Sequence, residues 1–195
     1  LRHDNVLITR TFSKAWGLAG LRVGYAIGHP AVITTLRAVA GPYPCAATSL
    51  ALALRWLELG RDHVSEFIAT IRQERQALAA HLSTLAAAPN FPATLTLWPS
   101  QGNFVFLSLV PRILEAPDSQ SPRDHLSPAQ HVHASLAAAG IAVRAYPART
   151  LTATAQDNQP TQINLDPTLR ITCPGNSAHF ERLTTALTTA FASLR

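Results

Sequence analysis

The longest regular pattern in the sequence is an apolar stripe between Val64 and Leu85, whose members recur at three- and four-residue spacings. This spacing places them on one face of an α-helix. The stripe is formed by Val64, Phe67, Ile68, Ile71, Leu78, Leu82 and Leu85. The polar side of the helix is expected to carry Glu66, Arg72, Glu74 and Arg75. A helix of this length, ending before Pro89, could connect two lobes.

Before this helix, the sequence predicts the end of a larger α/β domain, over residues 1–88 with the connecting helix included. Val6-Leu7-Ile8 is a continuous apolar run, typical of a strand buried on both faces of a parallel sheet. A second strand is expected over residues 21–27. Helices are expected over residues 31–40 and 46–59.

After the helix, the sequence predicts a small α+β domain over residues 89–195. Ser127-Pro128-Ala129-Gln130 predicts a helix start, with Ser127 as the N-cap and Gln130 completing a capping box. Asn176 or Ser177 is expected to cap a last helix. The strands are expected over 95–98, 104–110, 141–146 and 169–173, and the loops over 111–126 and 147–168.

Composition excludes several classes of function. The chain has 195 residues, of which 47% are hydrophobic and 14% charged, as in a globular domain. No apolar run reaches the roughly 18 residues of a membrane span. The net charge is +5, but the arginines are scattered without interleaved aromatic residues, so we expect no nucleic-acid partner. Cys45 and Cys173 lie in unrelated contexts, which favours a reduced, cytoplasmic setting over a disulfide.

Lys14 is the only lysine in the chain. Arginine stays protonated, whereas a lysine amine can lose its proton and form a Schiff base with a carbonyl. A unique lysine after a strand is therefore a candidate nucleophile, and an ordinary surface lysine is the alternative.

The neighbours of Lys14 favour the first interpretation. Thr11 and Ser13 supply hydroxyl groups, Gly17 permits close backbone approach, and Arg22 supplies a forked cation. Hydroxyls and an arginine beside a tight turn suit a phosphate monoester, although a turn with ordinary caps would use the same residue types. A Schiff-base lysine beside a phosphate site indicates pyridoxal 5′-phosphate as the cofactor.

The segment TRTFSKAWGLAGLRVGY, residues 9–25, resembles the lysine motif of fold-type I pyridoxal-phosphate aminotransferases of class I/II. It is especially similar to the histidinol-phosphate aminotransferase branch. Four further segments follow in the order of that branch: GPYP at 41–44, QGNFVF at 101–106, GIAVR at 140–144 and LRIT at 169–172. The resemblance runs along nearly the whole chain but covers only the C-terminal portion of the family's length. It implies that residues 1–88 belong to a large cofactor-binding domain.

The resemblance implies a role for each matching residue. Lys14 would bind the cofactor aldehyde and then move the proton at the substrate α-carbon. Ser13 and Arg22, together with Thr11, would hold the cofactor phosphate. The substrate would be received by Arg170 at its α-carboxylate, by Arg144 at its phosphate end and by Asn103 near the carboxylate. The family also implies a homodimer of the full-length protein, acting on an amino acid or amino phosphate and a 2-oxo acid.

Strand alternation supports the two substrate arginines independently. In the strand over 141–146, Arg144 shares a face with Tyr146, opposite Ile141 and Val143. In the strand over 169–173, Arg170 is opposite the apolar residues on either side of it. Each arginine is therefore expected to project away from an apolar face, into a cleft or, as the alternative, into solvent.

Several features set limits on these expectations. The chain contains no methionine, so we expect it to be a piece of a longer protein. The family's acidic partner of the pyridine nitrogen is not in this sequence, so the isolated chain is expected to be inactive. Two local features depart from the branch: Pro174, which could shift Arg170, and the 147–168 connection, which is longer than usual. His131 and His133 point apart on a helix, and no metal site is predicted.

A pyridoxal-phosphate decarboxylase and an inactive truncated remnant are the competing hypotheses.

Overall fold

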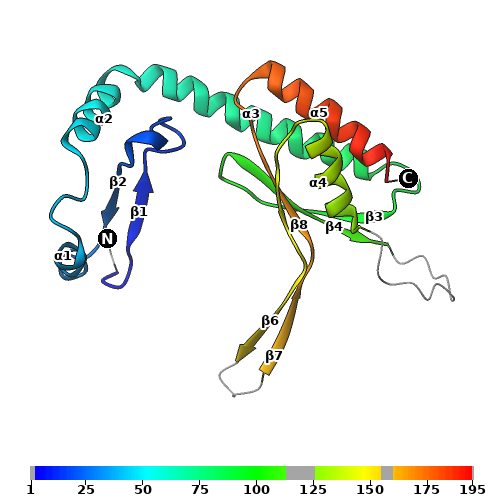
Figure 1. The fold of residues 1–195 in the computed structure, drawn as a ribbon, viewed down its shortest axis with the longest axis horizontal. Coiled ribbons are helices and arrows are strands. Elements are labelled where there is room, and N and C mark those ends of the chain that lie inside the picture. The colour runs from blue at the N-terminus through cyan, green and yellow to red at the C-terminus, as the bar shows by residue number, and fades with distance from the viewer. Residues whose placement is uncertain (1–2, 113–125, 155–159, 195) are drawn as a thin grey trace. The chain divides into compact units, whose positions relative to one another are not determined.

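A computed structural model describes residues 3–112, 126–154 and 160–194, with the side chains of 151–154 and 160–164 excepted (Figure 1). The chain forms two compact units, residues 1–69 and 70–195, which we call unit 1 and unit 2. The boundary falls inside helix α3 (Arg61–Ala86). The sequence-based domain boundary, between residues 88 and 89, falls just after the end of that same helix.

Unit 1 contains two strands, β1 (Ile8–Thr11) and β2 (Gly24–Ile27), followed by α1 (Pro30–Val39), α2 (Ala47–Leu59) and the first turns of α3. The strands pair antiparallel, with Ile8 opposite Ile27 and Thr11 opposite Gly24. The expectation of a buried parallel strand at the start of the chain is wrong, because all residues of β1 and β2 are exposed. The connection between them is a turn with one short 3₁₀ helix, η1 (Ala19–Leu21), whereas a parallel pair needs a longer crossover.

Gly24 is required by the close approach of the two strands. A Cβ atom at this position would lie 2.6 Å from the carbonyl oxygen of Arg10, a backbone atom that cannot move aside. The strand predicted over 21–27 is shorter in the structure, where β2 begins at Gly24 and η1 includes residue 21. The hairpin therefore brings the segment around Lys14 back to Arg22.

Unit 2 is built on a four-stranded antiparallel sheet in the order β3 (Ala93–Trp98), β4 (Phe104–Pro111), β8 (Thr168–Thr172) and β5 (Arg144–Tyr146). Val105, Leu107, Leu169 and Ile171 are buried on one face of it. Helix α4 (Pro128–Ala138) packs on β4, β5 and β8 and against α5 (Ser177–Ala192). Figure 1 shows both helices on one side of this sheet, which leaves the other face open.

Both helix starts in unit 2 agree with the sequence. Ser127 and Gln130 form the predicted capping box: Ser127 Oγ accepts from Gln130 N at 3.3 Å, and Gln130 Oε1 accepts from Ser127 N at 2.8 Å. Asn176 caps α5 through its side-chain oxygen, which accepts from His179 N at 3.1 Å. Leu183, Leu187 and Phe191 of the predicted stripe are buried.

The 147–168 connection is not the loop that was predicted. It forms a β-hairpin of β6 (Arg149–Thr154) and β7 (Pro160–Leu165), paired antiparallel with Arg149 opposite Leu165. This hairpin extends from the sheet between β5 and β8, the two strands that carry Arg144 and Arg170 (Figure 1). The 111–126 loop lies almost wholly outside the described residues.

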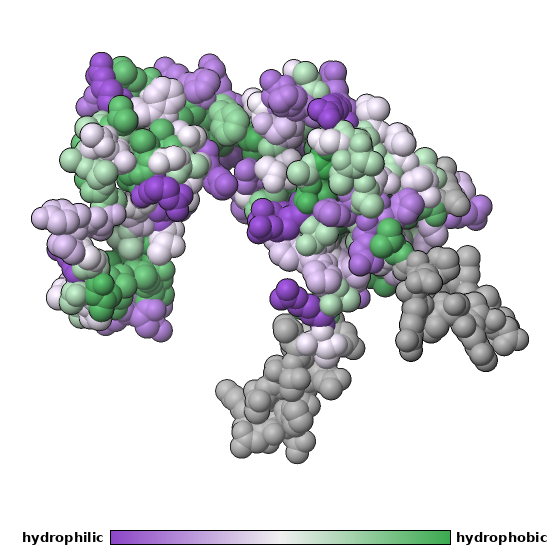
Figure 2. All heavy atoms as spheres, viewed as in Figure 1, coloured by the Kyte–Doolittle hydropathy of each residue, from purple (hydrophilic) through white to green (hydrophobic). Residues whose placement is uncertain are grey.

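The two units differ in how much apolar surface they bury. The core of unit 2 includes a stacked pair, Phe91 and Phe191, whose ring centroids are 5.4 Å apart. In unit 1 the described buried apolar residues are Val23, Ala53 and Val64. Tyr25, Ile27 and Val39 are among the exposed hydrophobic residues of unit 1. Figure 2 shows green, hydrophobic patches on the surface of this unit. Within the described ranges, no helix is both long and apolar enough to span a membrane.

Candidate functional site

Lys14 lies in the turn that joins β1 to β2 and is exposed. Backbone hydrogen bonds fix this turn: Phe12 N donates to Val23 O at 3.2 Å, and Leu18 N donates to Phe12 O at 3.0 Å. Gly17 N donates to Lys14 O at 3.0 Å, with Gly17 at a φ of 68°, which favours glycine. The turn therefore presents the lysine amine on a defined backbone.

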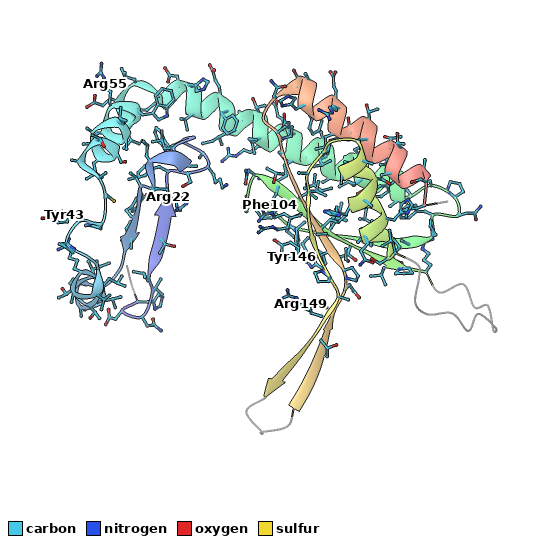
Figure 3. All side chains as sticks on the ribbon, viewed as in Figure 1. Arg22, Tyr43, Arg55, Phe104, Tyr146 and Arg149 are labelled. Atoms are coloured by element: carbon cyan, nitrogen blue, oxygen red, sulfur yellow. The ribbon has the colours of Figure 1, made fainter. Side chains whose placement is uncertain are left out.

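The structure brings the two predicted hydroxyl groups together beside Lys14. Thr11 Oγ1 donates to Ser13 Oγ at 2.7 Å, and Ser13 N donates to Thr11 Oγ1 at 3.1 Å. Arg22 follows η1 with a φ of 55°, an uncommon left-handed conformation for a residue other than glycine. Its Nη1 donates to Ala19 O at 3.2 Å, and its other N–H groups make no hydrogen bond to a described residue (Arg22 is labelled in Figure 3). Within the described residues, no hydrogen bond joins Arg22 to Thr11, Ser13 or Lys14.

A pocket of about 440 Å³ adjoins Lys14 within unit 1. Its aromatic walls include Trp16 and Trp56, and Trp56 Nε1 donates to Trp16 O at 3.1 Å. His63 packs edge-on against Trp56, with ring centroids 6.1 Å apart. Sequence reasoning did not find Trp56 and His63, because both lie far along the chain from the lysine motif.

Arg170 and Arg144 lie on the open face of the unit 2 sheet. Arg170 is directly opposite Phe106 on one side and Arg144 on the other, so all three side chains share that face. This agrees with the strand alternation in the sequence. β8 stays paired with β4 through Thr172, two residues before Pro174.

The guanidinium of Arg170 has an unsatisfied donor. Its Nε is buried and makes no hydrogen bond to any described residue. Its Cζ lies 5.5 Å from the centroid of the Phe104 ring. No ion pair within the described ranges reaches Arg170 or Arg144, although both are cations on neighbouring strands. An anion could accept a hydrogen bond from Nε and balance the two positive charges.

A shallow groove of about 420 Å³ opens beside Arg170. One wall is the turn before β4, where Arg75 Nη1 donates to Gly102 O at 2.7 Å. Asn103 lies in the same turn, but it is not among the groove's lining residues. Its carbonyl oxygen accepts from Cys173 N at 2.9 Å, which ties the turn to β8.

Glu74 was predicted on the polar side of the long helix, but in the structure its side chain is buried. Its Oε2 accepts from Gly175 N at 2.8 Å and holds the turn after β8. Burial, followed by the negative charge of Glu74, raises the pKa of the Cys173 thiol to about 11. Cys45 and Cys173 are both free. In the described part of the chain, no three His, Cys, Asp or Glu side chains gather as metal ligands would.

Comparison with known proteins matches residues 2–187 to the family model for aminotransferase class I and II. An aromatic amino acid aminotransferase from Mycobacterium tuberculosis (strain ATCC 25618 / H37Rv) is 45% identical over 107 residues, which are 55% of this chain and 28% of that relative. A histidinol-phosphate aminotransferase from Synechococcus sp. (strain JA-3-3Ab) is 43% identical over 108 residues, or 53% of this chain and 27% of that relative. The matched stretch thus spans less than a third of either curated relative.

Proposed function

The chain belongs to the aminotransferase class I and II family, and from this premise we propose that it supplies the lysine and the carboxylate-binding arginine of a pyridoxal-phosphate-dependent aminotransferase. The reaction would move an amino group from an amino acid, or an amino phosphate such as histidinol phosphate, to a 2-oxo acid. The observation that carries the proposal is the arginine pair on the open face of unit 2, with the Nε of Arg170 buried and unpartnered.

The arginine pair favours an anionic ligand for two physical reasons. Like charges directly opposite each other across antiparallel strands destabilise the sheet, and an anion between them removes that cost. A buried N–H without an acceptor costs roughly 1–3 kcal/mol, which a carboxylate oxygen would recover. Arg170 would therefore bind and orient the α-carboxylate, while the more exposed Arg144 would meet a second anionic group.

The residues of the β1–β2 turn fit a phosphorylated aldehyde cofactor. The linked hydroxyls of Thr11 and Ser13 and the free N–H groups of Arg22 are donors of the kind that hold a phosphate monoester. The exposed amine of Lys14 is available for a carbonyl carbon. When bound, pyridoxal phosphate would supply an electron sink for the α-carbon of the substrate.

Each residue of the chain then has a separate task. Lys14 Nζ would bind the cofactor covalently and, once displaced, hold the proton removed from the α-carbon. Thr11, Ser13 and Arg22 would keep the cofactor phosphate in place. Arg75 would position the turn that lines the Arg170 groove, through its 2.7 Å hydrogen bond to Gly102 O. Asn103 would act near the carboxylate.

Product analysis tests the proposal on the protein that contains this chain. Incubation with pyridoxal phosphate, an amino donor and 2-oxoglutarate should consume the acceptor in step with the donor. Release of carbon dioxide without consumption of the acceptor would instead identify a decarboxylase. No turnover of any donor would identify an inactive remnant.

Two donors should be compared in the same assay, L-phenylalanine and histidinol phosphate. One relative is named an aromatic amino acid aminotransferase and the other a histidinol-phosphate aminotransferase. Arg144→Gln should lower kcat/KM for histidinol phosphate more than for L-phenylalanine, because only the first donor carries a phosphate. Equal losses for both donors would contradict the role proposed for Arg144.

A further inference from the structure

The turn that carries Lys14 is tied to helix α2 by a hydrogen bond from a tryptophan side chain. Trp56 Nε1 donates to Trp16 O at 3.1 Å, although the two residues are 40 positions apart in the sequence. Both side chains are half-buried. The acceptor is a backbone atom two residues after the lysine, so this bond acts on the course of the turn itself.

The accepting carbonyl belongs to the peptide group between Trp16 and Gly17. On the opposite side of that group, Gly17 N donates to Lys14 O at 3.0 Å. A trans peptide group is a rigid plane whose C=O and N–H point in opposite directions. Rotation of this plane therefore breaks both hydrogen bonds together. The indole of Trp56 thus holds the bond that reaches the carbonyl of Lys14.

The backbone of Gly17 cannot select this orientation unaided. Its φ is 68°, in a region that glycine adopts about as readily as the corresponding negative values. The peptide group before it can therefore turn over at little steric cost. Because Gly17 is also exposed, neighbouring side chains do not enclose it. The bond from Trp56 is what favours one orientation over the other.

Trp56 is itself held where α2 meets α3. A Cβ atom at position 60 would lie 2.7 Å from Cε2 and 2.9 Å from Cδ2 of the indole, so Gly60 leaves the space that the ring occupies. His63 packs edge-on against the same ring, with centroids 6.1 Å apart. The two contacts fix the indole while its N–H reaches the turn.

We propose that Trp56 is a positioning residue for Lys14. Its N–H locks the Trp16–Gly17 peptide group, and through it the turn from which the lysine amine must reach the cofactor aldehyde. The inference rests on the cofactor role proposed for Lys14. It adds a residue on α2 that touches neither cofactor nor substrate and acts through the backbone of the turn.

Two replacements separate the N–H from the packing of the ring. Trp56→Phe keeps an aromatic ring and removes the donor. Incorporation of 3-benzothienylalanine at position 56 keeps the bicyclic shape, with sulfur in place of N–H, and is the variant least able to disturb the fold. Trp98→Phe makes the same change as the first variant in unit 2 and is the control.

Hydrogen exchange tests the lock without any cofactor. In NMR spectra of the ¹⁵N-labelled 195-residue chain, the chain's three tryptophans give three indole N–H signals. The Trp56 signal should exchange at least about fivefold more slowly than that of Trp98, which makes no hydrogen bond within the described residues. Both replacements of Trp56 should speed exchange of the Gly17 amide about fivefold, the loss of one net hydrogen bond. The Phe12 amide, bonded to Val23 O, should keep its rate.

Borohydride trapping tests the consequence for Lys14. The chain is titrated with pyridoxal phosphate, reduced and digested, and the labelled fraction of the Lys14 peptide is measured by mass spectrometry. The cofactor concentration for half-maximal labelling should rise about fivefold in both Trp56 variants, because the turn no longer holds one conformation. Trp98→Phe should match the wild type.

Three results would overturn the proposal, each for a different reason. Unchanged Gly17 exchange in both variants would mean that the N–H does not lock the turn. Faster exchange of Phe12 together with Gly17 would mean that Trp56 stabilises unit 1 as a whole. Faster Gly17 exchange with unchanged labelling would mean that the lock does not serve Lys14. If the wild type is not labelled at Lys14 at all, the proposed cofactor role fails, and the exchange rates still show whether the lock exists.

Discussion

Arg170 is the residue whose surroundings most favour the proposed anionic ligand. Its Nε is buried without an acceptor, and Arg144 faces it across the neighbouring strand. The buried N–H and the paired positive charges are both unfavourable, and the Phe104 ring, 5.5 Å from the guanidinium Cζ, offsets only part of that cost. Such a cost at one position supports the proposed binding role of Arg170.

Replacing Arg170 therefore separates binding from folding. In the protein that contains this chain, Arg170→Gln should raise KM for the amino donor about tenfold or more, because a charge-assisted pair with the carboxylate is lost. The free energy of unfolding should fall by no more than about 1 kcal/mol, since the side chain makes no hydrogen bond within the described residues and loses only its contact with the Phe104 ring. Arg72→Gln, which replaces an exposed arginine on α3, is the control and should leave KM at the wild-type value. An equally unchanged KM in Arg170→Gln would contradict the role of Arg170.

Cys173 gives a prediction on pH. Burial and the Glu74 carboxylate raise the pKa of its thiol from 9.0 to about 11, so the folded state holds the proton more tightly than the unfolded state. The resulting stabilisation is fully present below pH 9 and is lost as the pH rises from about 9 to 11. Over that range it amounts to at most about 3 kcal/mol.

Urea unfolding at pH 8 and pH 10.5 measures this effect. The fall in unfolding free energy should be smaller in Cys173→Ala than in the wild type, and Cys45→Ala should behave as the wild type does. The same alkaline fall in Cys173→Ala and in the wild type would show that the thiol is not the titrating group.

At the scale of elements, the sequence predicted those parts of the fold that depend on local signals. The Ser127 capping box, the Asn176 cap and the faces of Arg144 and Arg170 follow from residue type and spacing, and the structure has all of them. The buried parallel strand was wrong, because a continuous apolar run does not distinguish a covered sheet from an exposed hairpin. Burial depends on contacts that one segment cannot specify.

The β6–β7 hairpin was missed although its sequence carries a signal. Threonines alternate with other residues over 150–154, and polar residues alternate with Ile163 and Leu165 in β7. Alternation and β-branched residues are typical of strands. The prolines and amides of the connection obscured this pattern. The structure also has a pocket at the hairpin base, which could not be predicted because it combines β3, β4 and β5 with residues of the hairpin.

The capping box allows a test of one element alone. Ser127→Ala removes the acceptor for Gln130 N at the start of α4 and should lower the unfolding free energy by about 1 kcal/mol. Ser83→Ala on α3 is the matched control, since its hydroxyl only bonds back to Ala79 O within the helix. Chemical denaturation of both variants measures the difference, and equal stabilities would mean that the box does not stabilise α4.

At the scale of the whole molecule, the two units differ in their buried cores. Unit 2 has a sheet covered on one face by helices and the Phe91–Phe191 stack. Unit 1 exposes both strands and many apolar side chains of α1 and α2. Exposed apolar surface of this extent marks an interaction site. The homodimer that the family resemblance implies stays a prediction.

Hydrogen exchange should reflect this difference in the isolated chain. Amides of β1 and β2 in unit 1 should exchange well before those of β4 and β8 in unit 2, because few buried contacts oppose local opening of the hairpin. Mass spectrometry of peptides from 8–27, 104–111 and 168–172 would measure it. Equal protection in the two units would mean that unit 1 is stabilised by contacts beyond its own small core.

Lys14 is proposed to bind the cofactor aldehyde, and borohydride reduction can trap that bond. The chain is mixed with pyridoxal phosphate, reduced, digested and mapped by mass spectrometry, with Lys14→Arg as the control that keeps the charge. Because Lys14 is the only lysine, its side chain is the only ε-amine available. We predict a stable pyridoxyl label on the peptide that contains Lys14, absent from Lys14→Arg. A label confined to the N-terminal amine, and equal in both proteins, would contradict the role proposed for Lys14.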